Sequence, residues 1–146
     1  MIKIDYPQHP YKIKTEKGKE YIFDEIRKQW VSLTPEEWVR QNFLQYLVQV
    51  KKFPASLIAI EKEIRLGELT KRCDIVIYNK NAEPLLITEC KAMEVKIDSG
   101  AAEQIIRYNM SLPVQYLVIT NGRYCFAFER TGTDFFDLPE IPPWEE

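Results

Sequence analysis

The chain has 146 residues, of which 45% are hydrophobic and 12% aromatic, and its formal net charge at pH 7 is −2. This length and composition indicate a single globular domain over residues 1–146 and argue against a disordered chain. No apolar run is long enough for a membrane span, and the opening MIKIDYPQHP lacks the apolar stretch of a signal peptide. The three cysteines fit neither a disulfide framework nor a zinc site, so we expect a cytoplasmic protein.

The first third of the chain contains a lead-in and then a helix. Residues 1–33 form the lead-in, with a possible short hairpin between 21–23 and 29–33. Thr34 suits the N-cap and Pro35 the first helical position of a helix that Pro54 ends. Its apolar residues recur every three or four positions and form one stripe: Val39, Phe43, Tyr46, Leu47 and Val50.

The middle and end of the chain alternate between strands and one further helix. Strands are expected at 56–64, 72–78 and 85–91, followed by a helix over 100–112 capped by Asp98 or Ser99, and by strands at 114–120 and 124–129 around Asn121-Gly122. This order predicts an α/β fold with a mixed central sheet flanked by helices. Residues 34–130 would form the core, and 131–146 an acidic, proline-rich C-terminal extension.

The strand at 85–91 is apolar, yet it ends in Glu89 and Lys91, whose side chains leave the strand by the same face. If Tyr78 faces Leu85 across the turn, Asp74 faces Glu89 on the neighbouring strand. Two opposed carboxylates beside an ammonium suit a Mg²⁺ site for phosphodiester hydrolysis. A register shifted by two residues would instead place Asp74 opposite Lys91 in an ordinary ion pair.

Several segments together resemble a known family. Asp74 followed at 14 residues' distance by Glu89-Cys90-Lys91 is similar to the PD-(D/E)xK nuclease motif. TPEEWVRQNFLQYL, KRCDIVIY, LLITECKA, EQIIRYN and LVITNG, in this order, resemble the N-terminal nuclease domain of type I restriction enzyme R subunits over roughly residues 20–144. The resemblance implies a restriction-endonuclease-like αβββαβ core. Cys73 stands where the motif's name has proline.

The resemblance also implies roles for individual residues. Asp74 and Glu89 would bind Mg²⁺, or Mn²⁺ in its place, and Lys91 would be the catalytic lysine. Glu37 matches an additional acidic metal ligand, although Thr34-x-x-Glu37 is also a capping box. Gln104 and Tyr108 match the QxxxY of some of these nucleases, with Gln104 catalytic. Tyr108 is also a candidate nucleic-acid contact, and Arg72 and Lys96 are further candidates because of their proximity to the motif in the sequence.

The expected function is therefore that of a Mg²⁺-dependent DNA endonuclease domain, with DNA as a partner and restriction–modification subunits or other proteins as candidate partners. No GxxxxGK[ST] phosphate loop occurs, so an ATPase motor is not implied. The alternative is a nuclease-fold module that binds DNA or protein and is inactive without partner subunits. The near-neutral charge and the five acidic residues of 134–146 favour this alternative.

Overall fold

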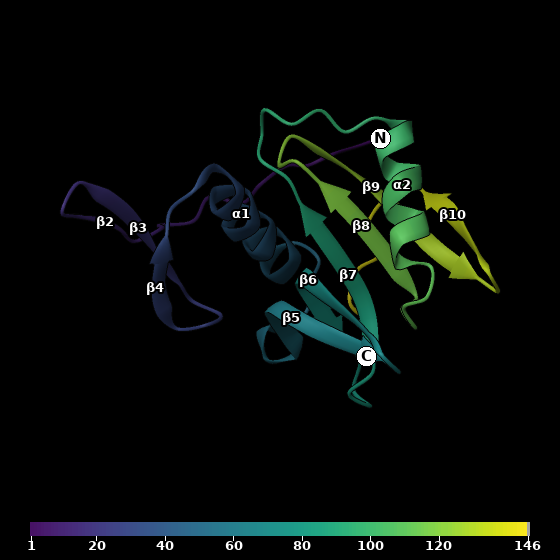
Figure 1. Ribbon diagram of the computed structural model, residues 1–146. Coiled ribbons are helices and arrows are strands. Elements are labelled where there is room, and N and C mark those ends of the chain that lie inside the picture. Colours follow the sequence, from purple (N-terminus) through teal and green to yellow (C-terminus); the bar gives the residue numbers. More distant parts are fainter. Residues whose placement is uncertain (146) are drawn as a thin grey trace.

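The computed structural model describes residues 1–145, together with all of their side chains except those of Leu66 and Tyr108. Its elements follow in the order β1 (Ile2–Lys3), β2 (Ile13–Glu16), β3 (Lys19–Asp24), β4 (Gln29–Ser32), α1 (Pro35–Gln49), the 3₁₀ turn Ala55–Leu57, β5 (Ile58–Leu66), β6 (Leu69–Tyr78), β7 (Pro84–Cys90), α2 (Ser99–Asn109), β8 (Tyr116–Thr120), β9 (Tyr124–Thr131) and β10 (Asp134–Leu138). The predicted mixed α/β architecture is confirmed (Figure 1).

A seven-stranded sheet forms the centre of the molecule. Its strands lie in the order β1-β9-β8-β7-β6-β5, with β10 pairing with β9. β7 and β8 are parallel and are joined through α2, whereas their outer neighbours pair antiparallel. The sheet is therefore mixed, and β7 lies in its middle, where the predicted Glu89-Cys90-Lys91 segment ends the strand.

The two helices cover opposite faces of this sheet. Val39 and Phe43 of α1 pack against Ile75 and Leu86, while α2 packs against the cluster that contains Val76. Neighbouring residues of one strand thus enter different cores, as expected for side chains that alternate across a sheet buried on both faces. The helix ends are capped as predicted: Thr34 Oγ1 accepts from Glu37 N at 3.0 Å, and Asp98 Oδ1 accepts from Ala101 N at 2.9 Å.

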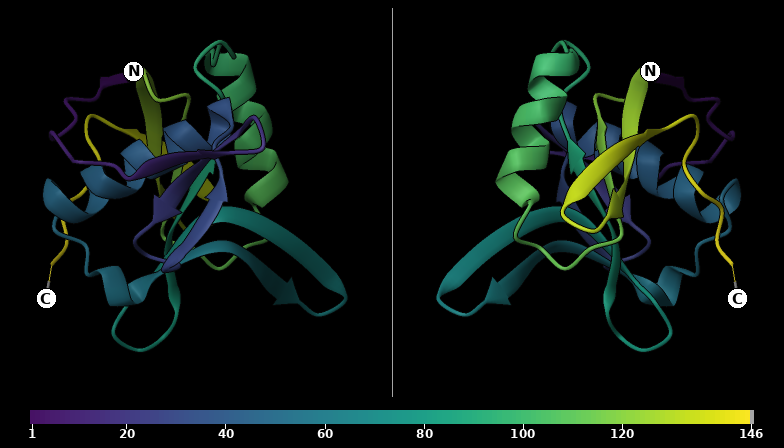
Figure 2. Two further views of the ribbon diagram at one scale, coloured as in Figure 1. Left: turned by 90° about the vertical axis from the view of Figure 1, so that its left-hand side faces the viewer. Right: turned by 90° about the vertical axis from the view of Figure 1, so that its right-hand side faces the viewer.

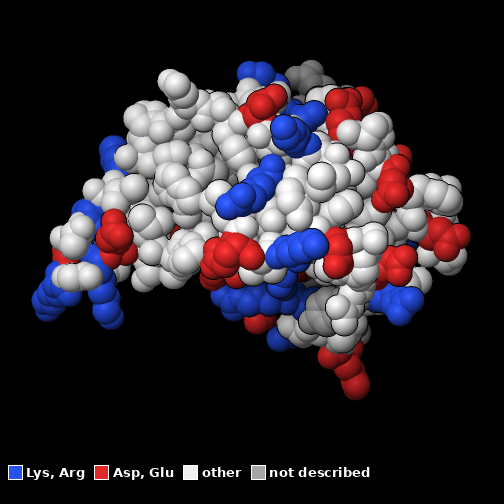
Figure 3. All heavy atoms as spheres, turned by 90° about the horizontal axis from the view of Figure 1, so that it is seen from above, with Lys and Arg blue, Asp and Glu red and all other residues white. Residues whose placement is uncertain are grey.

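A second, three-stranded sheet, β2-β3-β4, lies beside α1 on the side away from the large sheet (Figures 1 and 2). The β3–β4 pair confirms the hairpin expected in the lead-in, while β2 is an additional strand. Basic side chains gather with a few acidic ones at the projecting end of this sheet, whereas acidic and basic side chains are mixed on the opposite half of the face seen in Figure 3.

The chain ends contribute two further strands that the sequence did not reveal. β1 pairs with β9, and β10 forms from part of the segment expected to be merely extended. After β10 the chain returns across the molecule, where Ile141 is fully buried and Trp144 packs edge-on against Phe53 at 6.0 Å between ring centroids. Within the described residues, no helix is long and apolar enough to cross a membrane.

Candidate active site

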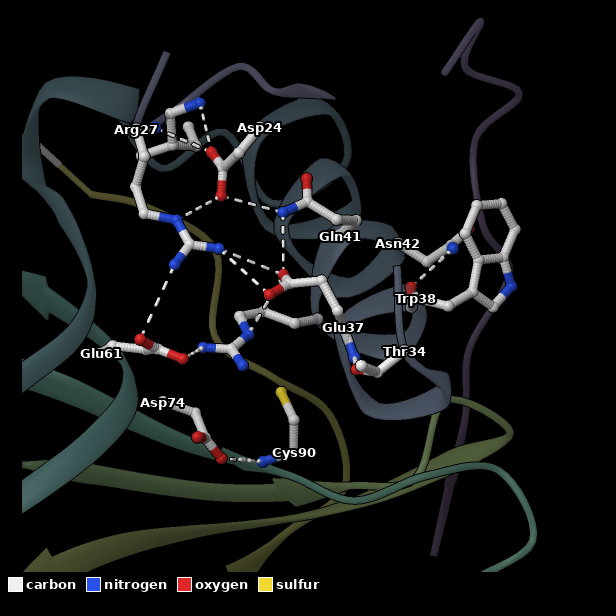
Figure 4. A network of polar contacts seen from close by, with 12 residues as sticks. Asp24, Arg27, Thr34, Glu37, Trp38, Gln41, Asn42, Glu61, Asp74 and Cys90 are labelled. Atoms are coloured by element: carbon white, nitrogen blue, oxygen red, sulfur yellow. Dashed lines mark hydrogen bonds and ion pairs between the residues drawn. The ribbon is translucent and has the colours of Figure 1, made fainter. Parts of the chain in front are cut away.

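Asp74 and Glu89 come together where β6 and β7 begin to separate. The register pairs Ile75 with Thr88 and Ile77 with Leu86, so one further step places Asp74 opposite Glu89. At this step Asp74 Oδ2 accepts a hydrogen bond from Cys90 N at 2.7 Å (Figure 4). The alternative register, with Asp74 facing Lys91, is therefore wrong.

The predicted pairing of Tyr78 with Leu85, from which that register was counted, was also wrong. Tyr78 faces Pro84 rather than Leu85, because the turn is one residue shorter than expected. Asn79 N donates to Glu83 O at 2.8 Å and closes the turn, and Asn79 Oδ1 accepts from the amides of Asn81 and Glu83. A bulge between Ile77 and Tyr78 compensates for the missing residue, which restores the predicted register further along the strands.

The carboxyl group of Glu89 carries an unusual proton affinity. Burial, the negative charge of Asp74 and a hydrogen bond with Asp74 raise the pKa of Glu89 to about 7, while the positive charge of Lys91 acts in the opposite direction. Near neutral pH, a proton on Glu89 therefore relieves the repulsion between its carboxylate and that of Asp74. A divalent cation with oxygen preference could replace that proton.

Lys91 extends the site toward α2. Its backbone N–H donates to Thr120 O at 2.8 Å, which continues the β7–β8 pairing, and its side chain is exposed. Lys91, Lys96 and Gln104 all line one open cavity of about 310 Å³. The structure thus brings three of the candidate residues to one surface hollow. Lys91, two residues after Glu89, connects this hollow to the carboxylate pair. The side chain of Tyr108, a fourth candidate on α2, lies outside the described residues.

Glu37 takes part in a different set of contacts. Its carboxylate accepts two hydrogen bonds from Arg27 Nη2, at 3.1 and 3.2 Å, and one from Gln41 Nε2 at 3.0 Å (Figure 4). Arg40 Nε lies 3.3 Å from the same carboxylate. The backbone half of the capping box is formed with Thr34, but the side chain of Glu37 serves this buried arginine network. The neighbouring Glu36 is exposed, and its charge contributes to raising the pKa of Glu89.

Arg40 connects this network to the carboxylate pair. Burial acts to lower the pKa of Arg40, but the charges of Glu37, Asp74 and Glu61 raise it overall. Arg40 Nη1 also donates to Glu61 Oε1 at 3.1 Å. A permanent cation therefore lies between Glu37 and the Asp74 side of the site.

Glu61 is the site residue that sequence reasoning missed most clearly. Ile60 pairs with Ile75 and Lys62 with Cys73, so Glu61 stands on β5 opposite Asp74. Three acidic residues thus occupy corresponding positions on three adjacent strands. Glu61 has a left-handed φ of 52°, which is rare and strained for a residue with a side chain.

Arginines donate hydrogen bonds to the carboxylate of Glu61 and stabilise its charged form. A hydrogen bond from Arg72 Nη2 at 3.0 Å is the largest cause of its lowered pKa, and Arg40 adds to the effect. Arg72, a candidate phosphate contact, is therefore an exposed partner of Glu61. Alternation along β5 could not have indicated these contacts, because Ile60 packs on the side of α1 and regular alternation would turn Glu61 to the opposite face.

The residues described do not contain a group of three His, Cys, Asp or Glu side chains arranged to hold a metal ion. Mg²⁺, however, is commonly bound through one or two protein carboxylates, with waters and substrate phosphate oxygens completing the octahedron. The Asp74–Glu89 pair supplies that minimum with hard oxygen ligands. These residues therefore fit Mg²⁺, with Glu37 as a ligand remaining a prediction.

The cysteines do not compete with this site. All three are free and buried. Burial raises the pKa of Cys73 to about 11 and that of Cys125 to about 12, and it is also the main cause of the raised pKa of Cys90. These thiols are protonated near neutral pH, so they are poor nucleophiles.

Comparison with known families agrees with the geometry. Residues 35–142 match the family model described as type I restriction enzyme R protein N terminus (HSDR_N). The chain belongs to this family. The match confirms the family expected from the motifs and covers α1 through β10 of the HSDR_N chain. No curated protein matches the chain as a relative.

The raised pKa of Glu89 leads to a stability prediction for this HSDR_N chain. The folded state holds this proton more tightly than the unfolded state does, so the group's contribution to stability falls as pH rises from about 4.5 to about 7. Glu89→Gln removes this penalty, and we expect it to raise the free energy of unfolding at pH 8 by about 1–2 kcal/mol. Urea unfolding of both proteins at pH 5 and pH 8 would measure the effect. An equal difference at both pH values would contradict the assignment.

Proposed function

We propose that this HSDR_N chain is a Mg²⁺-dependent DNA endonuclease domain that hydrolyses phosphodiester bonds, with Mn²⁺ as a substitute metal. The observation that carries the proposal is the Asp74–Glu89 carboxylate pair, which the β6–β7 register places opposite each other beside Lys91. The order α1, β5, β6, β7, α2, β8 is also the one expected for a restriction-endonuclease-like core. Family membership supports the same function.

Each candidate residue would have a separate role in metal binding, in catalysis or in positioning the DNA. Asp74, held by its hydrogen bond from Cys90 N, and Glu89, once deprotonated, would hold the metal. Bound Mg²⁺ would stabilise negative charge on the scissile phosphate and lower the pKa of a coordinated water. Lys91 would orient the attacking water and balance developing charge. Gln104 and Lys96, from the same cavity, would position the DNA strand beside it.

Relaxation of supercoiled plasmid with Mg²⁺ tests the proposal. We expect the folded wild-type chain to produce nicked circles in Mg²⁺ or Mn²⁺ and none in EDTA, because hydrolysis depends on metal at the carboxylate pair. Circular dichroism of the same sample would establish that it is folded. Cleavage that persists in EDTA, or that is unchanged in Asp74→Asn, would contradict the proposed chemistry.

The second candidate is a nuclease-fold module that binds DNA or protein and does not cut without partner subunits. The contacts of Glu37 favour it, because Arg27 and Arg40 already neutralise the carboxylate predicted as an additional metal ligand. A folded wild-type chain that binds DNA but gives no metal-dependent nicking would select this candidate. Restoration of cleavage by added restriction–modification subunits would identify the missing component.

A further inference from the structure

The outward face of the small sheet β2-β3-β4 combines aromatic rings with lysines. Directly paired residues share a face of a sheet, and the pairs are Lys14 with Tyr21, and Phe23 with Trp30. The opposite face is the packed one, because it contains the fully buried Ile22. The outward face thus presents three aromatic and three basic side chains, which are Tyr21, Phe23, Trp30, Lys12, Lys14 and Lys19.

The rings on this face are partly accessible, and flexible cations lie over two of them. Trp30 is 39% exposed and meets Phe23 edge-on, with ring centroids 5.4 Å apart. Lys14 Nζ lies 4.4 Å from the centroid of Trp30, and Lys12 Nζ lies 5.8 Å from that of Phe23. A lysine can leave a ring at little cost, because an exposed cation–π contact contributes only about 0.5–1 kcal/mol.

The charges on this face favour a polyanion. Among the described outward-facing residues of the three strands, Glu16 is the acidic one, and it pairs with Lys14 at 3.4 Å. Lys17 and Lys28 add further cations at the two turns of the sheet, where both have left-handed φ values of 50° and 56°. Figure 3 shows basic side chains gathered at the projecting end of the molecule.

We propose that this face binds an unpaired segment of DNA, with bases stacked on Trp30 and Phe23 and phosphates held by Lys12, Lys14 and Lys19. Aromatic platforms bordered by cations bind single strands, because unpaired bases expose the ring faces that a duplex hides. The choice of DNA rests on the proposed nuclease function. The face lies before residue 35, so it is outside the segment that matches the family.

Fluorescence anisotropy tests this surface independently of cleavage. The probe is a fluorescein-labelled oligothymidylate of about 12 nucleotides, within the range of known single-strand sites. Titrations are made in EDTA, so that a lack of nuclease activity does not affect the result. We expect the single strand to bind more tightly than a duplex of equal length.

The variants separate stacking from charge. We expect Trp30→Ala to weaken binding about tenfold, while Trp30→Phe, which keeps a ring, retains most of it. Lys14→Ala should lower the slope of log affinity against log salt by about 0.7, the value for one phosphate contact on a single strand. Lys80→Ala, an exposed lysine in the β6–β7 turn, is the matched control and should bind as wild type does.

Three outcomes would overturn the proposal. They are unchanged affinity in both Trp30→Ala and Lys14→Ala, duplex binding as tight as single-strand binding, and tighter binding of oligouridylate than of oligothymidylate. A chain that binds oligothymidylate through Trp30 but fails to nick plasmid would leave this surface supported while contradicting nuclease activity. A chain that nicks plasmid but binds oligothymidylate equally well without Trp30 and Lys14 would support the nuclease function and contradict this binding surface.

Discussion

Lys91→Ala is expected to lower the rate of Mg²⁺-dependent plasmid cleavage by a factor of about 10²–10⁴, the usual contribution of a side chain that assists proton transfer. The side chain of Lys91 is exposed, so its removal should leave the free energy of unfolding close to that of wild type. Rates of appearance of nicked circles, measured at saturating Mg²⁺, would give the factor. Lys80→Ala removes another exposed lysine, from the β6–β7 turn, and should cut at the wild-type rate.

The charge of Lys91 also acts on its neighbour, and the pH profile separates the two effects. Lys91 lowers the pKa of Glu89, so Lys91→Ala should raise that pKa further and weaken metal binding near neutral pH. If the lysine acts only through Glu89, raising the pH to about 9 would restore most of the rate. If it assists the attacking water, the loss persists at every pH. A Lys91→Ala variant as active as wild type at pH 7 would remove the lysine from the mechanism.

Asp24→Ala is expected to lower the free energy of unfolding by about 3–5 kcal/mol, as when one partner of a buried ion pair is deleted. Asp24 is fully buried and accepts hydrogen bonds from Ile26 N, from both N and Nε of Arg27, and from Gln41 Nε2, all at 2.7–2.9 Å. Alanine leaves these donors without their acceptor, and Arg27 is largely shielded from water. Urea unfolding monitored by circular dichroism would measure the loss.

A matched control for Asp24 is available at the start of α2. Asp98 is an exposed carboxylate that accepts from Ala101 N at 2.9 Å, so Asp98→Ala removes a helix cap at a cost of about 1 kcal/mol. Asp24→Asn keeps an oxygen for the two turn amides but loses the charge opposite Arg27, so an intermediate loss is expected. Equal losses for Asp24→Ala and Asp98→Ala would show that burial of the network contributes no additional stability.

Local signals predicted the elements that surround the candidate site. The side chains of Thr34 and Asp98 cap the two helices, and the ring of Pro35 suits the first helical position. Asn121-Gly122 predicted the β8–β9 hairpin. The opposition of Asp74 and Glu89 was predicted through two errors that cancel, a turn one residue too long and an unforeseen bulge. Neither the bulge nor the length of a turn closed by its own Asn79 is visible in the pattern of apolar residues.

The parts that were missed depend on contacts between distant segments. β1 has two residues and β10 only five, and both gain their hydrogen bonds from β9, so neither carries a clear local pattern. The position of Glu61 follows from the β5–β6 register, and the arginines that surround it come from the β3–β4 turn, α1 and β6. Gln41 and Arg40 could have been placed beside Glu37 from their helical spacing, but their partners outside α1 could not.

Arg27 has a consequence for where this protein can be divided. Its guanidinium joins Asp24 at the end of β3, Glu37 on α1 and Glu61 on β5, so one side chain fastens the small sheet to the helix and to the large sheet. An expression fragment that begins at residue 35, where the family match begins, would lack both Asp24 and Arg27. Glu37 would then keep Arg40 as its neighbouring cation but lose the arginine nitrogen that now donates to both of its carboxylate oxygens. The boundary drawn by sequence similarity therefore cuts through this ion-pair network, which extends to the end of β3.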